Sequence, residues 1–168
     1  WPVFPQLLRD TFMEEFSQEK LKDPSTRMIE QNWEKVISSV RDSLVVCNHC
    51  SEETFVDTSK IKDRCIDCGN DVDLAKRLII NNRSLPLTNK TNIYIDNDNT
   101  PDGVVTTDAN GFMLIKNIST ETWTVETPSG KVKTVAPQEI LPVKEGLKIT
   151  FRVHTVPYKA EIKFMSND

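Results

Sequence analysis

The chain has 168 residues, of which 38% are hydrophobic and 27% are charged, and its formal net charge is −4 at pH 7. This length suits one ordinary domain or two or three small ones, and the small net charge indicates neither a nucleic-acid-binding surface nor a polyanionic tail. No stretch approaches the ~20 apolar residues of a transmembrane helix, and no secretion signal opens the chain, so we expect a soluble protein without membrane contact.

Residues 1–44 are predicted to form a helical hairpin. The chain opens on Trp1 rather than Met, which leaves open that it is a piece of a longer polypeptide. A first helix is expected over residues 5–20, because apolar side chains recur there at spacings of three to four. Its stripe comprises Phe4, Leu7, Leu8, Phe12 and Phe16. After a break at Pro24, Ser25 or Thr26 can cap a second helix. The second stripe comprises Ile29, Trp33, Val36, Ile37, Val40 and Leu44, and we expect the two stripes to face each other.

Residues 45–73 contain all four cysteines, as Cys47-Asn-His-Cys50 and Cys65-Ile-Asp-Cys68. Two residues between cysteines let both sulfurs point into one tight turn, and two such turns supply four thiolates in a tetrahedron. This clustering favours a metal site over a disulfide framework and therefore a reducing, cytoplasmic compartment. Because the segment has too few apolar residues for its own core, a metal is expected to hold it together as a zinc ribbon.

The predicted cofactor is one structural Zn²⁺, since four thiolates close the coordination shell. Gly69 follows the second pair and suits a chain that turns around the metal. His49 is an alternative ligand, although the four-sulfur set is complete without it. An iron or iron–sulfur site has the same sequence signature and stays open. Lys60, Lys62 and Arg64 either offset the negative charge of the thiolates or form a solvated edge.

Residues 74–168 are predicted to form an all-β sandwich, which makes the chain α+β overall. Short runs rich in β-branched residues alternate here with Asn, Asp, Gly and Pro clusters. Candidate strands cover residues 77–81, 91–95, 104–107, 112–117, 122–126, 131–135, 147–153 and 160–164. Asp102-Gly103, Asn110-Gly111 and Ser129-Gly130 are turn dipeptides. Trp123 lies in an alternating strand and is expected to be a core residue rather than an exposed ligand platform.

The first segment carries a pattern that resembles the last two helices of the C-terminal lobe of a eukaryotic-like serine/threonine protein kinase. The pattern reads Leu8-x-x-x-Phe12-x-x-x-Phe16, then Asp23-Pro24-x-x-Arg27, then Trp33. The resemblance implies that Arg27 pairs with the Glu that ends the kinase activation segment, upstream of Trp1. The glycine-rich loop, the phosphate-binding Lys, the His-Arg-Asp and the Asp-Phe-Gly motifs of a kinase have no counterpart in the sequence. This piece is therefore not expected to be an enzyme by itself.

The order that follows is similar to bacterial kinases that carry a zinc ribbon directly after the kinase lobe. In them, a module resembling a forkhead-associated domain often comes next. Asn117-Ile118-Ser119 resembles the Asn-x-Ser after a central strand of that family, and residues 146–151 resemble its closing Gly-Asp-x-Ile-x-Phe. The family reads phosphothreonine with a Gly-Arg after an early strand, whereas the strand here ends Tyr94-Ile95-Asp96-Asn97. We therefore expect a degenerate module that does not bind phosphothreonine by the usual route.

The acidic loop places Asp96, Asp98 and Asp102 at positions one, three and seven, which invites a calcium hypothesis. No bidentate Glu follows, so a turn is the simpler interpretation. His49 and His154 lie far apart in the sequence and outside any hydrolase motif. No residue indicates a further ligand-binding site.

The sequence predicts a non-catalytic, zinc-binding regulatory or protein-interaction region of a serine/threonine kinase. Its expected partner is another protein or the kinase catalytic domain. The alternative is a zinc-ribbon nucleic-acid-binding protein, which calls for a basic stripe with exposed aromatic residues. The sequence pI of about 5.3 argues against that alternative.

Overall fold

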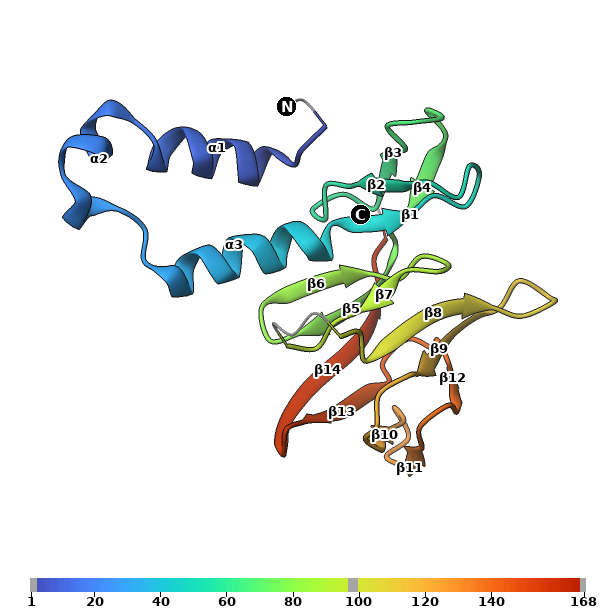
Figure 1. The fold of residues 1–168 in the computed structure, drawn as a ribbon. Helices are drawn as coiled ribbons and strands as arrows, with labels where there is room; N and C mark the ends of the chain where they lie inside the picture. The colour runs from blue at the N-terminus through green and yellow to red at the C-terminus, as the bar shows by residue number, and fades with distance from the viewer. Residues whose placement is uncertain (1–2, 97–99, 167–168) are drawn as a thin grey trace.

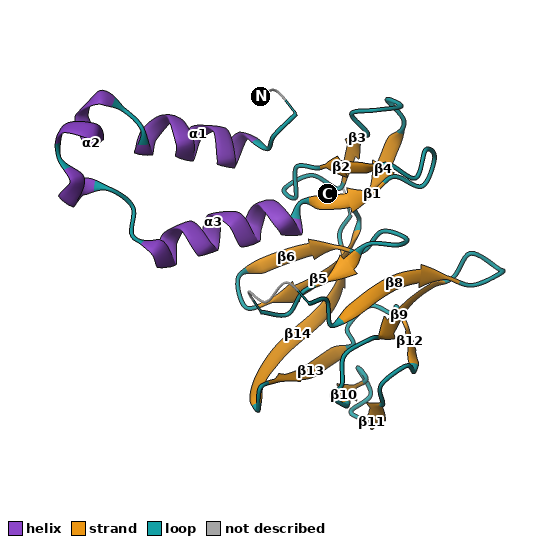
Figure 2. Cartoon of the chain, in the orientation of Figure 1, coloured by secondary structure: helices purple, strands orange, loops and turns teal. Residues whose placement is uncertain are grey.

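The computed structural model describes residues 3–96 and 100–166 and combines a few helices with antiparallel sheets (Figures 1 and 2). This confirms the mixed α+β class. The helical elements are α1 (Gln6–Glu15), α2 (Gln18–Lys22), the 3-10 turn η1 (Pro24–Thr26) and α3 (Glu30–Asp42). Within the described ranges, every helix is too short or too polar to cross a lipid bilayer.

The first helix is shorter than predicted. It ends at Glu15, and the Ser17 hydroxyl accepts the backbone N–H of Lys20 at 3.4 Å, so a separate helix α2 begins there. The prediction that Ser25 or Thr26 caps the second helix was wrong. Both residues belong to η1, which is capped by the Asp23 carboxylate, and α3 starts four residues after Thr26.

Helices α1 and α3 contact each other as a hairpin that projects away from the sheets (Figure 1). The ring of Phe12 packs edge-on against Trp33 with centroids 5.3 Å apart, and Leu8 is buried. Glu15, also buried, forms an ion pair with Lys20 and accepts the backbone N–H of Met28 at 2.6 Å. Much of the predicted apolar face nevertheless stays exposed, namely Phe4, Leu7, Phe16, Ile29 and Ile37.

Residues 44–73 form two short hairpins, which we call the ribbon. Strand β1 (Leu44–Val46) pairs with β2 (Glu53–Phe55), and β3 (Lys62–Arg64) pairs with β4 (Asp71–Asp73), both antiparallel. Their buried apolar cluster is small and includes two of the cysteines. It comprises Val45, Cys47, Val56, Cys65, Val72 and Leu74.

Two antiparallel sheets follow and share one apolar core, so we call them the β-sandwich. The six-stranded sheet has the order β11-β10-β13-β14-β5-β6, and the four-stranded sheet has the order β12-β9-β8-β7. The strands are β5 (Lys76–Ile80), β6 (Arg83–Pro86), β7 (Asn92–Ile93), β8 (Gly103–Thr107), β9 (Met113–Asn117), β10 (Trp123–Glu126), β11 (Val132–Val135), β12 (Ile140–Pro142), β13 (Lys148–Val153) and β14 (Val156–Phe164). All eight predicted strands are present, and β6 and β12 are additional.

The core of the β-sandwich draws on both sheets, with Leu78 of β5 and Ile115 of β9 fully buried. Trp123 is 1% exposed and packs edge-on against Phe151 at 4.8 Å, which confirms its predicted place in the core. Asn110-Gly111 and Ser129-Gly130 do lie in hairpin turns. Asp102-Gly103 does not lie in a hairpin turn, because Gly103 begins β8. The glycine instead leaves room for the Trp123 ring, since a Cβ there would lie 3.1 Å from that ring.

The end of α3 is joined to the β-sandwich by two arginines. The Arg83 guanidinium donates to both carboxylate oxygens of Asp42, at 2.7 and 2.8 Å. It also donates to the carbonyl oxygens of Tyr94 and Ile95, each at 2.9 Å. Arg41 lies over the Tyr94 ring, 4.4 Å from its centroid. Such bidentate, charge-assisted bonds fix orientation as well as distance.

Arg77 joins the ribbon to the β-sandwich. Although its side chain begins on β5, it is only 3% exposed, because the guanidinium lies under the loop between β2 and β3. There it donates to the carbonyl oxygens of Thr58 and Lys60, and it also donates to Leu74 O at 3.0 Å. Burial lowers the pKa of this guanidinium, whereas the nearby Asp57 carboxylate raises it. The ribbon thus has a fixed orientation on the sheets.

Candidate metal centre

The first cysteine pair lies in the turn between β1 and β2. The backbone N–H of Cys47 donates to Glu52 O at 2.9 Å, and the N–H of Ser51 donates to Cys47 O at 2.9 Å. The backbone N–H of His49 points at the Cys47 sulfur, 3.4 Å away. These bonds close a tight turn, here called the first knuckle, that turns the side chains of Cys47 and Cys50 to one side.

The second pair repeats this turn between β3 and β4 as the second knuckle. The N–H of Cys65 donates to Asn70 O at 2.8 Å, and the N–H of Gly69 donates to Cys65 O at 2.9 Å. Gly69 has φ +70°, in the left-handed region that glycine enters without steric cost. Ser51 holds the same place in the first knuckle with φ +63°. The turn at Gly69 was predicted from the sequence, whereas the role of Ser51 was not, although both residues follow the second cysteine of a pair.

The two knuckles bring the four predicted sulfurs together. The Sγ atoms of Cys47 and Cys68 are 3.7 Å apart, those of Cys50 and Cys65 are 3.6 Å apart, and all four lie within 4.8 Å of one another. A tetrahedron with Zn–S bonds of about 2.3 Å has sulfur–sulfur edges of about 3.8 Å. The four cysteines are therefore close enough to hold a metal ion. Among the described residues, this cluster contains the four cysteines and not His49.

Hydrogen bonds support the sulfurs from outside the cluster. The side-chain amide of Asn70 donates to Cys68 Sγ at 3.4 Å. The buried hydroxyl of Thr54, on β2, accepts the backbone N–H of Ile66 at 3.1 Å and so links the two knuckles. Partners of this kind orient metal ligands. Neither Asn70 nor Thr54 was predicted from the sequence. Asn70 could have been noticed for its place two residues after a cysteine.

The thiols have unequal acidities. The backbone N–H and side-chain amide of Asn70 lower the pKa of Cys68 to about 6. The backbone N–H of Glu52 lowers the pKa of Cys50, but burial and the neighbouring thiols outweigh it and raise that pKa to about 12. Cys68 is thus the more acidic thiol and Cys50 the less acidic one. A divalent cation among them would favour loss of the remaining protons.

The three basic residues before Cys65 pair with surface carboxylates. Lys60 Nζ lies 3.5 Å from Asp57, while Lys62 and Arg64 lie 3.3 and 4.0 Å from Asp71. All three cations are more than half exposed, so each pair contributes little to stability. The structure therefore supports the solvated-edge interpretation of these residues.

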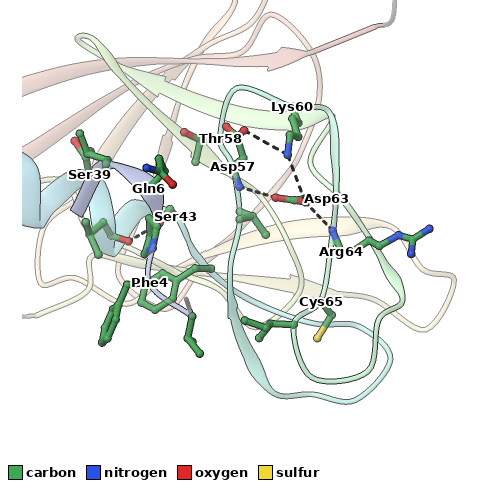
Figure 3. A pocket seen from close by; sticks show the side chains of 17 residues that line it. Phe4, Gln6, Ser39, Ser43, Asp57, Thr58, Lys60, Asp63, Arg64 and Cys65 are labelled. Carbon is green, nitrogen blue, oxygen red and sulfur yellow. Dashed lines mark hydrogen bonds and ion pairs between the residues drawn. The ribbon is translucent and has the colours of Figure 1, made fainter. Parts of the chain in front are cut away.

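A cavity of about 530 Å³ lies where the start of α1 and the end of α3 meet the ribbon (Figure 3). Phe4 and Phe55 contact each other there, with ring centroids 6.1 Å apart. Asp63 also lines the cavity, and its carboxylate accepts the backbone N–H of Asp57 at 2.8 Å. Cys65 also lines the cavity, so the metal centre borders the surface on which the hairpin rests.

The remaining predicted residues lie away from the cysteines. Arg27 is exposed and donates to the carbonyl oxygens of Lys20 and Leu21, at 3.2 and 3.4 Å. Trp33 belongs to the helical hairpin. The calcium hypothesis involves Asp98, which lies outside the described residues. The Asp102 carboxylate accepts the N–H of Ile95 at 2.9 Å.

Comparison with known proteins returned no match to a family model, a curated protein or a solved structure.

Proposed function

We propose that the chain is a non-catalytic, zinc-binding regulatory and protein-interaction region of a serine/threonine kinase. The ribbon acts in it as a rigid joint between the helical hairpin and the β-sandwich. The observation that carries the proposal is the convergence of four sulfurs in the turns of the ribbon, the segment that follows α3 and precedes β5. Four thiolates close the shell of a metal and leave no position for a substrate, so the ion supplies folding energy rather than chemistry.

The ion we propose is one Zn²⁺. Four soft sulfur ligands in a near-tetrahedral arrangement suit zinc, and backbone and amide N–H groups that face the sulfurs offset part of the thiolate charge. Iron accepts the same ligands. Elemental analysis of the purified protein decides between them: one zinc per chain supports the proposal, and iron or no metal contradicts it.

The joint is supported by the polar contacts on its two sides. Arg77 binds the ribbon loop from the six-stranded sheet, and Arg83 binds Asp42 at the end of α3. The backbone N–H of Val46, next to Cys47, donates to Thr91 Oγ1 at 3.3 Å. A metal that fixes the knuckles would then hold the ribbon to the β-sandwich through Val46 and Arg77, beside the direct contact of α3 through Arg83.

The helical hairpin leaves apolar side chains uncovered. Phe16, Ile29 and Ile37 are 59%, 60% and 51% exposed. Phe16 directly follows α1, Ile29 directly precedes α3, and Ile37 lies on α3. Clustered exposed apolar side chains mark interaction surfaces. We propose that the catalytic domain covers these side chains, and that Arg27 then reaches the Glu of the activation segment instead of the carbonyls at the end of α2.

The β-sandwich is proposed to be a degenerate module of the forkhead-associated type that binds a protein partner. The hydrogen bonds of Asn117 indicate that the Asn117-Ile118-Ser119 motif stabilises the fold of the β-sandwich. Asn117 is fully buried, and its amide donates to Glu121 O at 2.9 Å and Val135 O at 3.1 Å, while its oxygen accepts the N–H of Ser119. An Asn that is occupied in this way has no donor left for a phosphate.

Partner capture tests the proposal. Tagged full-length kinase and a variant without residues 74–168 should recover different sets of proteins or differ in kinase output. Identical partners and identical output would contradict the regulatory role. A gel-shift titration across salt concentrations tests the nucleic-acid alternative, which tight, salt-sensitive binding would favour. We expect no nucleic-acid binding, because Lys60, Lys62 and Arg64 pair with carboxylates.

A further inference from the structure

The four sulfurs differ in their access to solvent. Cys47 and Cys65 are 1% and 2% exposed, Cys50 is half-buried, and Cys68 is exposed. The difference arises because the second knuckle places Cys68 on its outer side, whereas Cys47 and Cys65 belong to the apolar cluster of the ribbon. A small reagent from solution therefore reaches Cys68 first.

Two close sulfur pairs join the two knuckles, within a cluster in which all four sulfurs lie within 4.8 Å of one another. Cys47 and Cys68 lie 3.7 Å apart, Cys50 and Cys65 lie 3.6 Å apart, and each pair takes one cysteine from each turn. A disulfide has an S–S length of about 2.05 Å, so each pair has to close by roughly 1.6 Å. Short turns without bulky contacts can supply such a movement: a Cβ at Gly69, for example, would meet no atom within 4 Å.

We propose that a hydroperoxide converts the metal centre into two disulfides between the knuckles, Cys47–Cys68 and Cys50–Cys65, and releases the metal. This proposal rests on the metal site of the proposed function. It adds that the ribbon responds to oxidants, with exposed Cys68 as the first residue to react.

The chemistry balances with hydroperoxide as the only oxidant. The Cys68 sulfur attacks one peroxide oxygen, the O–O bond breaks, hydroxide or alkoxide leaves, and Cys68 becomes a sulfenic acid. The Cys47 thiolate then attacks the Cys68 sulfur, the S–S bond forms and the S–O bond breaks with loss of hydroxide. A second peroxide oxidises Cys50 and Cys65 in the same way. Each bridge takes two electrons from sulfur, and the metal leaves because its thiolate ligands are gone.

The oxidised ribbon keeps a covalent link between its hairpins but changes the spacing of the knuckles. Cys65 lines the cavity where Phe4 of the hairpin meets Phe55 of the ribbon (Figure 3). Closing the Cys50–Cys65 pair moves this wall. Oxidation is therefore expected to alter the contact between hairpin and ribbon while the ribbon stays compact.

Tryptic mapping of the zinc-loaded, full 168-residue chain tests whether the bridges join the two knuckles, and fragmentation of the joined peptides between Cys47 and Cys50 shows which cysteine is bonded to which. Trypsin cleaves after Arg41, Lys60, Arg64 and Lys76, so Cys47 and Cys50 fall in one peptide (42–60), and Cys65 and Cys68 fall in another (65–76). After treatment with hydrogen peroxide and alkylation, we expect these two peptides to be joined by disulfides, with one zinc released per chain into a chromogenic chelator. Bridges confined to single peptides, or zinc release without bridges, would overturn the proposal.

A pair of ligand substitutions tests the order of attack. Cys68→His keeps four possible zinc ligands but removes the exposed sulfur, and Cys65→His does the same at a buried position. We expect Cys68→His to slow peroxide-driven zinc release at least about tenfold, and Cys65→His to slow its first step less than threefold. Equal rates would contradict the role of Cys68. If either variant binds no zinc, trapping of sulfenic acid with dimedone in the wild-type chain decides, since the first adduct must lie on Cys68.

Failure of this proposal is separable from failure of the proposed function. A purified chain without metal contradicts the zinc site itself. A chain that holds one zinc and keeps it under excess peroxide contradicts only the oxidant response.

Discussion

The ribbon and the β-sandwich are both built from short antiparallel strands, but they are stabilised in different ways. The β-sandwich buries large side chains from two sheets, among them Trp123, Phe151 and Ile162. The ribbon buries only four apolar side chains besides Cys47 and Cys65. A unit of this size cannot bury enough apolar surface to offset the entropy of folding. Strands alone therefore do not make a stable unit, and the ribbon requires its cysteines to be joined.

Metal removal should separate the two regions most clearly. We expect Cys65→Ser, or chelation of the wild type, to unfold the ribbon, because binding of structural zinc contributes about 10 kcal/mol or more. Amides of β1 to β4 should lose protection in hydrogen exchange, while those of β8 and β13 keep it. Readdition of zinc to the chelated wild type is the control. Uniform loss of protection, or none, would contradict the comparison.

Trp123→Ala tests how far the stability of the β-sandwich depends on its apolar core. Deleting a fully buried indole that packs against Phe151 is expected to cost the β-sandwich about 3–5 kcal/mol, measured by denaturant unfolding. Phe112→Ala is the matched control: this ring is 68% exposed, so the cost should stay within about 0.5 kcal/mol. Zinc content should remain one per chain in both variants. Loss of zinc from Trp123→Ala would show that the ribbon depends on the core of its neighbour.

Arg77→Met tests the contact that joins the ribbon to the β-sandwich. The substitution leaves the carbonyl oxygens of Thr58 and Lys60 without their donor, which should cost about 2–3 kcal/mol. NMR relaxation should then show the ribbon tumbling more independently of the sheets. Arg152→Met, an exposed position on β13, should change neither quantity. A ribbon that stays rigidly attached without Arg77 would contradict its role in the joint.

Acidity is expected to weaken zinc binding by the ribbon. Zinc binding at pH 7 has to displace the proton of Cys50, whose pKa is about 12, so affinity should fall about tenfold for each pH unit lost from this thiol alone. Cys68, with its pKa of about 6, is already ionised at pH 7 and adds a further proton only below pH 6. A plot of log affinity against pH should therefore steepen below 6. Zinc competition titrations measure the affinity at each pH. An affinity independent of pH would contradict four-thiolate ligation.

The strands that the sequence predicted and those that it missed differ in a physical way. The eight predicted strands have β-branched or alternating residues between turn signals. The two missed strands, β6 and β12, are short and end in Pro86 and Pro142. Proline removes a ladder donor and argues against a strand, yet both lie at the edges of their sheets, where that donor is not needed.

The cysteine turns depend on neighbouring residues in the sequence, whereas the contacts of the joint depend on distant ones. Cysteine spacing encodes a local turn, so the two knuckles could be predicted from neighbouring residues. The contacts of Arg77 with Thr58 and Lys60 span 19 and 17 residues and arise only after the ribbon folds onto the sheet. Likewise, Phe16 and Ile29 fit a helical stripe, but whether another surface covers them depends on residues far away in the sequence or in another chain.

The smallest expected effect compares the two knuckles. Ser51 and Gly69 share a left-handed backbone, at φ +63° and +70°, with different side chains. Gly69→Ala should weaken the ribbon by about 1 kcal/mol through backbone strain alone, since a Cβ at this position has open space around it. Ser51→Gly relieves the same strain but loosens the unfolded chain, so these opposing terms should nearly cancel, leaving a change within about 0.5 kcal/mol.

Zinc competition on the two variants measures both effects, with about a fivefold loss of affinity expected for Gly69→Ala and almost none for Ser51→Gly. A large gain from Ser51→Gly would mean that the serine is strained in the first knuckle and that its hydroxyl contributes nothing there. Equal losses in both variants would mean that the knuckles are held by side-chain contacts rather than by backbone conformation. The paired result therefore tests whether the two turns, alike in their hydrogen bonds, are also alike in energy.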